Sequence, residues 1–234
     1  MTAHPGTRTH FITGAGSGIG AAVAQVLHER GDRLVLLARS EARATELADR
    51  YPGSQTFAAD LASSDEIEVP DLDRLDSVLH VAGAVDLAAV ADQDAELVRR
   101  QVEVNLLAPM LLTQTLLPGL RAARGTVVFV NSSAGLSASA QWSAYAASKF
   151  GLRGFADALR AEEVDHGVRV TTVFPSRTAT PMQEKVHEQE GRVYDRSRWI
   201  QPDTVADTIL HVLDLPPDAT IPEVTVRPVV PRPG

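Results

Sequence analysis

Short apolar runs alternate with longer amphipathic stretches along this 234-residue chain. Continuous apolar runs of strand length predict buried β-strands. They lie at Arg8–Thr13, Arg33–Ala38, Ser77–Gly83, Thr126–Ser132 and Val168–Phe174, with a weaker run at Gln55–Asp60. Apolar positions at helical spacing predict one helix that starts near Ile19 and ends at Gly31, and further helices near Asp94–Leu117, Ser143–His166 and Pro202–Leu213.

This alternation of strands and helices predicts the fold class. Strands that are apolar on both faces are typical of a parallel sheet covered by helices on each side. We therefore expect an α/β protein with a single doubly wound domain over residues 1–234 and a mostly parallel sheet of about seven strands.

Two regions depart from the alternation. The acidic stretch Ser63–Asp76 is interrupted by Pro70 and is a poor helix where the pattern would require one. The C-terminal stretch is rich in proline, and ATIPEVTVRP (Ala219–Pro228) within it is expected to form one edge strand. Proline is tolerated in an edge strand but not in a central one.

Composition excludes several classes of protein. The chain is 44% hydrophobic and 22% charged, which is typical of a globular domain with a sizeable core. Its net charge of −8 argues against a general nucleic-acid binder. The absence of cysteine rules out disulfides and thiolate metal sites, and no metal is predicted. No apolar run is long enough for a membrane span and no signal peptide is visible, so a cytoplasmic protein is expected.

A glycine-rich turn, TGAGSGIG (Thr13–Gly20), joins the first predicted strand to the first helix. Glycines let a backbone approach a diphosphate closely, and a helix N-terminus offers free N–H groups and partial positive charge. The cofactor contacts predicted here are Gly14, Ser17, Gly18, Ile19 and Gly20. The alternative is a tight turn that serves only the path of the chain.

The end of the second strand indicates which dinucleotide is bound. An acidic residue at this position accepts hydrogen bonds from the ribose 2′-hydroxyl in many NAD sites. Here Ala38 is followed by Arg39, whose guanidinium suits a 2′-phosphate, with Ser40 assisting. This favours NADP(H) over NAD(H). Arg39 as an ordinary exposed loop residue is the alternative, and Arg43 is a second candidate for the phosphate.

Tyr145 and Lys149 in SAYAASKFG lie four residues apart, on one face of a predicted helix. A nearby ammonium stabilises phenolate and would lower the pKa of the tyrosine from about 10. A tyrosine that exchanges protons is what interconversion of a carbonyl and an alcohol requires, because the oxygen gains or loses a proton as hydride moves. Taken alone, the spacing is better explained by chance.

Four motifs in combination change that balance. TGAGSGIG, NSSAG (Asn131–Gly135), YAASK (Tyr145–Lys149) and PSRTATPM (Pro175–Met182) occur in the order and at the spacing typical of the short-chain dehydrogenase/reductase family. The chain resembles this family over nearly its whole length. The resemblance implies a Rossmann-type fold and an oxidoreductase that transfers hydride between NADP(H) and a carbonyl or secondary alcohol.

The resemblance also implies the catalytic roles. Tyr145 would be the general acid/base, and Lys149 would hold the nicotinamide ribose and lower the pKa of Tyr145. Ser132 would hydrogen-bond the substrate oxygen, although Ser133 is adjacent and simple loop polarity is an alternative.

Asn105 matches a helix asparagine of the family, whose backbone carbonyl is expected to hold a water linked to Lys149. Pro109, four residues later, has no N–H to pair with that carbonyl, which therefore needs another donor. A proline kink with only a packing role is the alternative.

Further cofactor contacts follow from the resemblance. They are Asp60 and Leu61 at the adenine, Val81, Ala82 and Gly83 beneath the adenosine, Tyr145 and Lys149, and Thr178 and Thr180 at the nicotinamide carboxamide. His80 and Val81 replace two family asparagines, and Ser176 replaces a glycine. His80 is interpreted as a packed strand residue rather than a base.

The segment Met182–Ile200 is expected to cap the substrate, which we predict to be small and polar. Arg192, Arg196 and Arg198 there are interpreted as solvated charges rather than carboxylate ligands. The resemblance also implies a homodimer or homotetramer, and no nucleic-acid or membrane partner is expected. A non-catalytic dinucleotide-binding sensor or partner subunit on the same fold is the alternative function.

Overall fold

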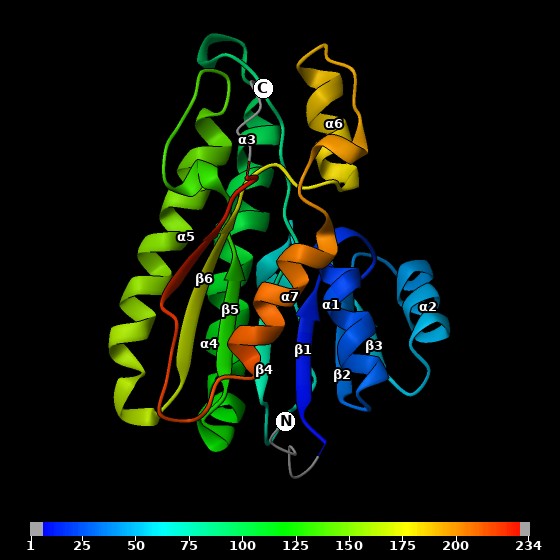
Figure 1. The fold of residues 1–234 in the computed structure, drawn as a ribbon, viewed down its shortest axis with the longest axis vertical. Helices are drawn as coiled ribbons and strands as arrows, with labels where there is room; N and C mark the ends of the chain where they lie inside the picture. Colours follow the sequence, from blue (N-terminus) through cyan, green and yellow to red (C-terminus); the bar gives the residue numbers. More distant parts are fainter. Residues whose placement is uncertain (1–6, 230–234) are drawn as a thin grey trace.

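The computed structural model describes residues 7–229, and its strands form one parallel sheet in the order β3-β2-β1-β4-β5-β6-β7 (Figure 1). The chain starts in the middle of the sheet, moves outward to β3, and returns to place β4 beside β1. The strands are β1 (Thr9–Thr13), β2 (Arg33–Ala38), β3 (Gln55–Ala58), β4 (Ser77–His80), β5 (Thr126–Val130), β6 (Arg169–Pro175) and β7 (Glu223–Val226). The predicted doubly wound sheet and its edge strand β7 are confirmed.

Helices cover both faces of this sheet, and two others extend past its carboxyl end (Figure 1). One face carries α1 (Gly18–Glu29), α2 (Glu41–Arg50) and α7 (Pro202–Leu213). The other carries α4 (Ala108–Ala123) and α5 (Ser143–Glu162). Beyond the carboxyl end lie α3 (Ala95–Val102) and α6 (Pro181–Gln189). Within residues 7–229, no helix combines the length and the apolar character needed to cross a lipid bilayer.

Alternate residues of the central strands belong to opposite cores. In β1, Ile12 packs beneath α1 and α7, whereas Phe11 packs beneath α4. Successive side chains of a strand point to opposite faces, so a strand covered on both sides must be apolar throughout. This is why the central strands were visible in the sequence as continuous apolar runs.

The helices were predicted less completely. The stretch expected as one helix near Asp94–Leu117 is α3, a π-helical turn at Glu103–Leu107 and α4. Helix α2 was not predicted, because only Ala44 and Leu47 of its ten residues are buried. The acidic stretch after β3 forms only a short 3-10 turn at Ser64–Glu66, as its poor helical pattern indicated.

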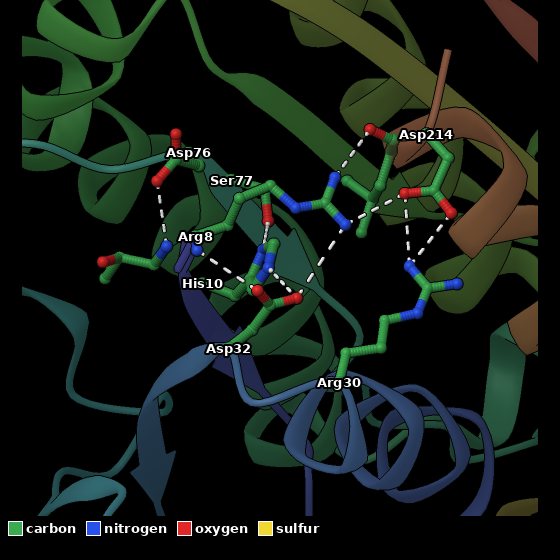
Figure 2. A network of polar contacts seen from close by, with 9 residues as sticks. Arg8, His10, Arg30, Asp32, Asp76, Ser77 and Asp214 are labelled. Carbon is green, nitrogen blue, oxygen red and sulfur yellow. Dashed lines mark hydrogen bonds and ion pairs between the residues drawn. The ribbon is translucent and has the colours of Figure 1, made fainter. Parts of the chain in front are cut away.

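A polar network joins the amino ends of the strands to the chain segments around them (Figure 2). His10 Nδ1 lies 2.7 Å from Ser77 Oγ, and His10 Nε2 lies 3.2 Å from Asp32 Oδ2. The Arg8 guanidinium donates to Asp214 Oδ1 at 2.9 Å, and Arg8 also lies 3.8 Å from Asp32. The network ties β1, β4 and the end of α7 together at the end of the sheet opposite the predicted site.

Candidate active site

Loops that follow the strands converge on a cavity of about 810 Å³ at the carboxyl end of the sheet. The chain leaves the neighbouring strands β1 and β4 in opposite directions, and such a switch point leaves a crevice where ligands bind. The predicted site residues that line this cavity are Gly14, Ser17, Gly18, Ile19, Gly20, Arg39, Asp60, Leu61, Val81, Ala82, Gly83, Ser132, Tyr145, Lys149, Thr178 and Thr180. Of the predicted set, Asn105 alone lies behind the wall.

The glycine turn is required by close packing as well as by any ligand. A Cβ on Gly14, whose φ is 78°, would lie 2.8 Å from the Ala82 nitrogen. A Cβ on Gly20 would lie 2.2 Å from the Gly14 oxygen, and one on Gly18 would lie 2.8 Å from a Thr180 methyl. Gly16, by contrast, faces open space in the cavity. The turn therefore serves the chain path and also leaves a bare backbone surface.

The N-terminus of α1 opens into this cavity. Ser17 occupies the N-cap position, but its side chain makes no capping hydrogen bond. The first N–H groups of the helix consequently have no side-chain acceptor and carry the partial positive charge of the helix dipole. This arrangement suits a diphosphate.

At the far end of the cavity, Arg39 is exposed and forms no ion pair with any described residue. Arg43, the second candidate for the phosphate, is paired with Glu46 on α2. Ser40 accepts a hydrogen bond from the Arg43 N–H at 3.4 Å and so caps α2. Of the two candidates for the phosphate, Arg39 is therefore the one left available, whereas Ser40 serves the helix.

Tyr145, Lys149 and Ser132 meet at the inner end of the cavity. Tyr145 and Lys149 are 6% and 3% exposed, and the Lys149 Nζ lies 5.7 Å from the centre of the Tyr145 ring. Nζ donates to the Val130 carbonyl at 3.1 Å. Ser132 forms a side-chain hydrogen bond with Tyr145, and its Oγ also accepts from the Ala134 N–H at 3.1 Å.

Burial governs the protonation of this pair. It raises the pKa of Tyr145 to about 12, although the hydrogen bond with Ser132 acts in the opposite direction. It also lowers the pKa of the Lys149 ammonium to about 8. The lowered pKa predicted for Tyr145 from its neighbouring ammonium is therefore not observed. Loss of solvent disfavours the phenolate, and the ammonium lies over the ring and donates to a carbonyl.

Asn105 acts on the site through its side chain. It is 1% exposed, and its amide exchanges two hydrogen bonds of 2.8 Å with the backbone of Ala84. Its Nδ2 also donates to Ser148 Oγ at 3.1 Å. Asn105 thus fixes the loop after β4 against α5. A π-helical turn, in which i→i+5 hydrogen bonds replace the i→i+4 pattern, surrounds Asn105. Pro109, four residues later, has no N–H that could bond the Asn105 carbonyl in the α-helical pattern.

Two positioning residues were missed in the sequence. Thr13 Oγ1 accepts hydrogen bonds from the N–H groups of Val81 and Ala82, at 3.1 and 3.2 Å. This contact braces the loop in which the family asparagines are absent. Asn131 accepts from the Ser132 N–H at 2.8 Å and donates to the Lys149 carbonyl at 2.9 Å. Each of the two is the first residue of a quoted motif, TGAGSGIG or NSSAG, which is the signal that could have revealed its role.

The two family departures are accommodated. His80 is buried, stacks on Phe129 with ring centres 5.0 Å apart, and lies 2.9 Å from Thr113 Oγ1. Burial lowers the pKa of His80 to about 3, so this imidazole is neutral and packed, as interpreted from the sequence. The Ser176 N–H donates to the Val226 carbonyl at 2.9 Å and so ties this loop to β7.

Helix α6 lies within the stretch expected to cap the substrate, and it lines the cavity through Met182, Gln183 and Val186. Lys185 anchors it to the loop after β4, with Nζ 2.9 Å from the Val85 carbonyl and 2.5 Å from Asp86 Oδ1.

The arginines of this stretch lie elsewhere. Arg192, Arg196 and Arg198 do not line the cavity, which agrees with their interpretation as solvated charges. Arg177, which comes just after β6 and before this stretch, does line the cavity, as do Arg100 and Lys149.

Comparison with known proteins identifies the family. The family model for short chain dehydrogenases matches residues 8–191. The chain is 34% identical to the uncharacterized oxidoreductase YciK of Escherichia coli, over 78% of each chain. It is 33% identical to dehydrogenase/reductase SDR family member 7B of Bos taurus, over 83% of this chain and 65% of the relative.

A solved Escherichia coli short chain dehydrogenase in complex with NADPH is similar in both sequence and fold. It is 30% identical, with a TM-score of 0.81, over 94% of this chain and 97% of that one. The match covers the glycine turn, the central sheet and the segment with Tyr145 and Lys149, and most of the chain lies within the family model. The chain belongs to the short-chain dehydrogenase/reductase family.

Proposed function

We propose that this oxidoreductase transfers hydride between NADP(H) and a carbonyl or secondary alcohol. The observation that carries the proposal is one cavity that joins the bare glycine turn to the Ser132, Tyr145 and Lys149 side chains. A dinucleotide held along this cavity supplies or accepts the hydride. The residues around it provide binding, orientation and proton transfer.

The proton chemistry follows from the two hydroxyls. Tyr145 and Ser132 lie within hydrogen-bonding reach of each other at the cavity wall, so both hydroxyls can turn to donate to one carbonyl oxygen placed between them. With a pKa of about 12, Tyr145 keeps its proton at neutral pH and is ready to donate it, which is the reductive direction. Lys149, with a pKa of about 8, is mostly protonated at pH 7 and stabilises the phenolate that forms.

Asn105 is proposed to position this relay. Its side chain holds the loop after β4 against α5. The contact on α5 is Ser148, which follows Tyr145 by three residues. We also assign its backbone carbonyl, in the π-helical turn before Pro109, to a water that returns a proton towards Lys149. The segment Met182–Ile200, which begins in α6, is proposed to cap the substrate.

NADP(H) is proposed over NAD(H) because of Arg39. Its guanidinium is exposed at the cavity rim, and Glu46 holds the neighbouring Arg43. An arginine recognises a phosphate through charge-assisted hydrogen bonds. A 30%-identical relative was solved with NADPH, and a 30%-identical Shigella flexneri relative was solved with NADP.

The test is a fluorescence titration with NADPH and with NADH. We expect tighter binding of NADPH, and Arg39→Ala should weaken it roughly 10- to 100-fold while NADH binding stays unchanged. Arg33→Ala, at the opposite end of β2, is the matched control and should change neither affinity. Equal affinity of the wild type for the two cofactors would contradict the assignment. Binding of NADPH without turnover of any ketone would instead favour a non-catalytic sensor.

A homo-oligomer is proposed through the helices on the α5 side of the sheet. Leu97 on α3, Leu107 in the π-helical turn and Phe150 on α5 are 40%, 38% and 44% exposed, and exposed large apolar side chains can mark an interface. A second copy of the chain would cover them. Phe150→Glu should then lower the mass measured by light scattering, whereas Val193→Glu on the capping segment should not.

A further inference from the structure

The cavity wall beside Tyr145 is apolar. Val85 and Val186 pack with Tyr145 in one buried cluster, and Met182 and Trp142 pack against it. The Trp142 ring stands edge-on to the Tyr145 ring, with centres 5.7 Å apart. A substrate whose carbonyl oxygen reaches Tyr145 must place its substituents against these side chains.

Arg177 lies against Trp142 of this wall, and its charge is already matched. Its two terminal nitrogens lie 2.8 and 2.5 Å from the two carboxylate oxygens of Glu190. Its guanidinium also lies over the rings of Trp142 and Trp199, 5.8 and 5.7 Å from their centres. A bidentate pair between two tryptophan rings leaves little of this guanidinium for a ligand.

Glu190 remains ionised in this arrangement. Its side chain is 11% exposed, and the hydrogen bonds from Arg177 hold the pKa of its carboxyl below the usual value. Arg192 lies 3.9 Å from the same carboxylate. An anionic substrate that approached Arg177 would therefore have to displace Glu190 and would meet its negative charge. Without a partner, burying a carboxylate against an apolar wall is costly.

We propose that the substrate is an uncharged carbonyl compound with a compact apolar or aromatic substituent, and that Glu190 enforces this choice by neutralising Arg177. The proposal rests on the proposed function and replaces the small polar substrate expected from the sequence. Glu190 is a specificity-determining residue that acts through Arg177. The apolar wall favours binding of the apolar substituent, and the ion pair between Arg177 and Glu190 disfavours binding of anions.

The experiment compares matched oxo esters and oxo acids. The probes are methyl acetoacetate against acetoacetate, and methyl benzoylformate against benzoylformate, each with saturating NADPH. We expect kcat/KM at least about tenfold higher for the esters, because the unpaired carboxylate must be desolvated. Equal or higher kcat/KM for the acids would overturn the proposal and leave the proposed function standing.

Glu190→Gln tests the mechanism of this choice. The amide keeps the shape of the side chain but frees the charge of Arg177, so the ester-to-acid ratio of kcat/KM should fall at least about tenfold. Glu188→Gln, an exposed neighbour on α6, is the matched control and should leave the ratio unchanged. An unchanged ratio in folded Glu190→Gln would overturn the role of Glu190.

The wild-type comparison needs no variant, so the substrate proposal stays testable if Glu190→Gln does not fold. A direct binding readout is also available, because the two tryptophans of the chain both lie against Arg177. The esters should quench tryptophan fluorescence at lower concentration than the acids in the complex with NADP⁺, which cannot reduce them. Turnover of neither esters, acids nor simple ketones despite NADPH binding would overturn both proposals together.

Discussion

Each end of the sheet places a serine beside ionisable side chains, but the two ends use these residues in opposite ways. At the amino end, Ser77, His10 and Asp32 form a hydroxyl–imidazole–carboxylate chain (Figure 2). Ser77 and His10 are 0% and 1% exposed, and neither lines the cavity. At the carboxyl end, Tyr145 is buried and Ser132 is half-buried, and both form part of the cavity wall.

The comparison shows that residue types alone do not make a catalytic site. The chain at the amino end has the members of a nucleophilic triad but gives a substrate no access to the hydroxyl. Its charges are also well matched: burial raises the pKa of Asp32, but the hydrogen bond and charge of His10, with Arg8, lower it overall. Lys149 has no such carboxylate partner, and its pKa is lowered instead. The amino end is therefore expected to stabilise the fold. At the carboxyl end, the buried Lys149 is expected to lower the stability of the fold while it serves the proposed proton transfer.

Replacing Lys149 should separate stability from activity most strongly. We expect Lys149→Met to lower kcat by at least about 100-fold, because the phenolate loses its stabilising charge. The free energy of unfolding should rise by about 1 to 2 kcal/mol. The fall of the pKa from 10.5 to about 8 represents a penalty of about 3 kcal/mol, and loss of the hydrogen bond to Val130 offsets about 1 kcal/mol of the gain.

Urea unfolding and steady-state kinetics at pH 7 measure both quantities. Arg153→Met is the matched control, since this arginine lies on the same helix as Lys149 but is paired with Glu223 away from the cavity. It should keep kcat and gain no stability. A Lys149→Met variant that is clearly less stable than the wild type would contradict the contrast between the two ends.

Asp32→Asn should have the opposite effect at the amino end. We expect the free energy of unfolding to fall by about 2 kcal/mol, because His10 and Arg8 lose their charged partner, while kcat changes less than about twofold. The pKa of Asp32 lies below its usual 3.8 in the folded protein. Its contribution is therefore complete above about pH 4 and is lost as the pH falls through the folded-state value.

Acid unfolding curves of the variant and the wild type should accordingly converge at low pH. Asp49→Asn, exposed on α2, is the control and should follow the wild type throughout. A loss of activity in Asp32→Asn at unchanged stability would show that the amino end has a functional role, and would contradict its assignment as a purely structural network.

The pH dependence of turnover gives the smallest of these effects. With a pKa of about 8, the Lys149 ammonium loses its proton in the accessible range, whereas Tyr145 keeps its proton up to about pH 12. Reductive kcat/KM should therefore fall about tenfold per pH unit above pH 8. In Lys149→Arg this limb should move to higher pH, because a guanidinium keeps its charge. If the fall in kcat/KM occurred at the same pH in Lys149→Arg as in the wild type, it would not arise from deprotonation of Lys149.

The fold and most of the candidate site could be predicted from the sequence, because both depend on short segments whose patterns are local. The buried parallel strands appear as continuous apolar runs, and the motifs around Gly14, Ser132 and Tyr145 are short segments that follow those strands. Their meeting in one cavity then follows from the parallel topology, which places all carboxyl ends at one edge. The family and the doubly wound fold were consequently predicted correctly.

Other features depend on contacts that the sequence does not reveal. Helix α2 has few buried residues and so little apolar pattern. The pairing of Arg177 with Glu190 joins the loop after β6 to the end of α6, and nothing in either segment marks the other. The pKa of Tyr145 was predicted in the wrong direction, since burial depends on the packing of Val85, Trp142 and Val186 around it.

The most direct measurement compares two variants that each remove one buried hydroxyl. Tyr145→Phe removes the proposed proton donor, and Tyr51→Phe removes a hydroxyl that only donates to the Ala21 carbonyl, at 3.2 Å. The account predicts that Tyr145→Phe binds NADPH as the wild type does but loses at least about 100-fold in kcat, whereas Tyr51→Phe keeps its kcat. Wild-type turnover of a ketone by Tyr145→Phe would contradict it.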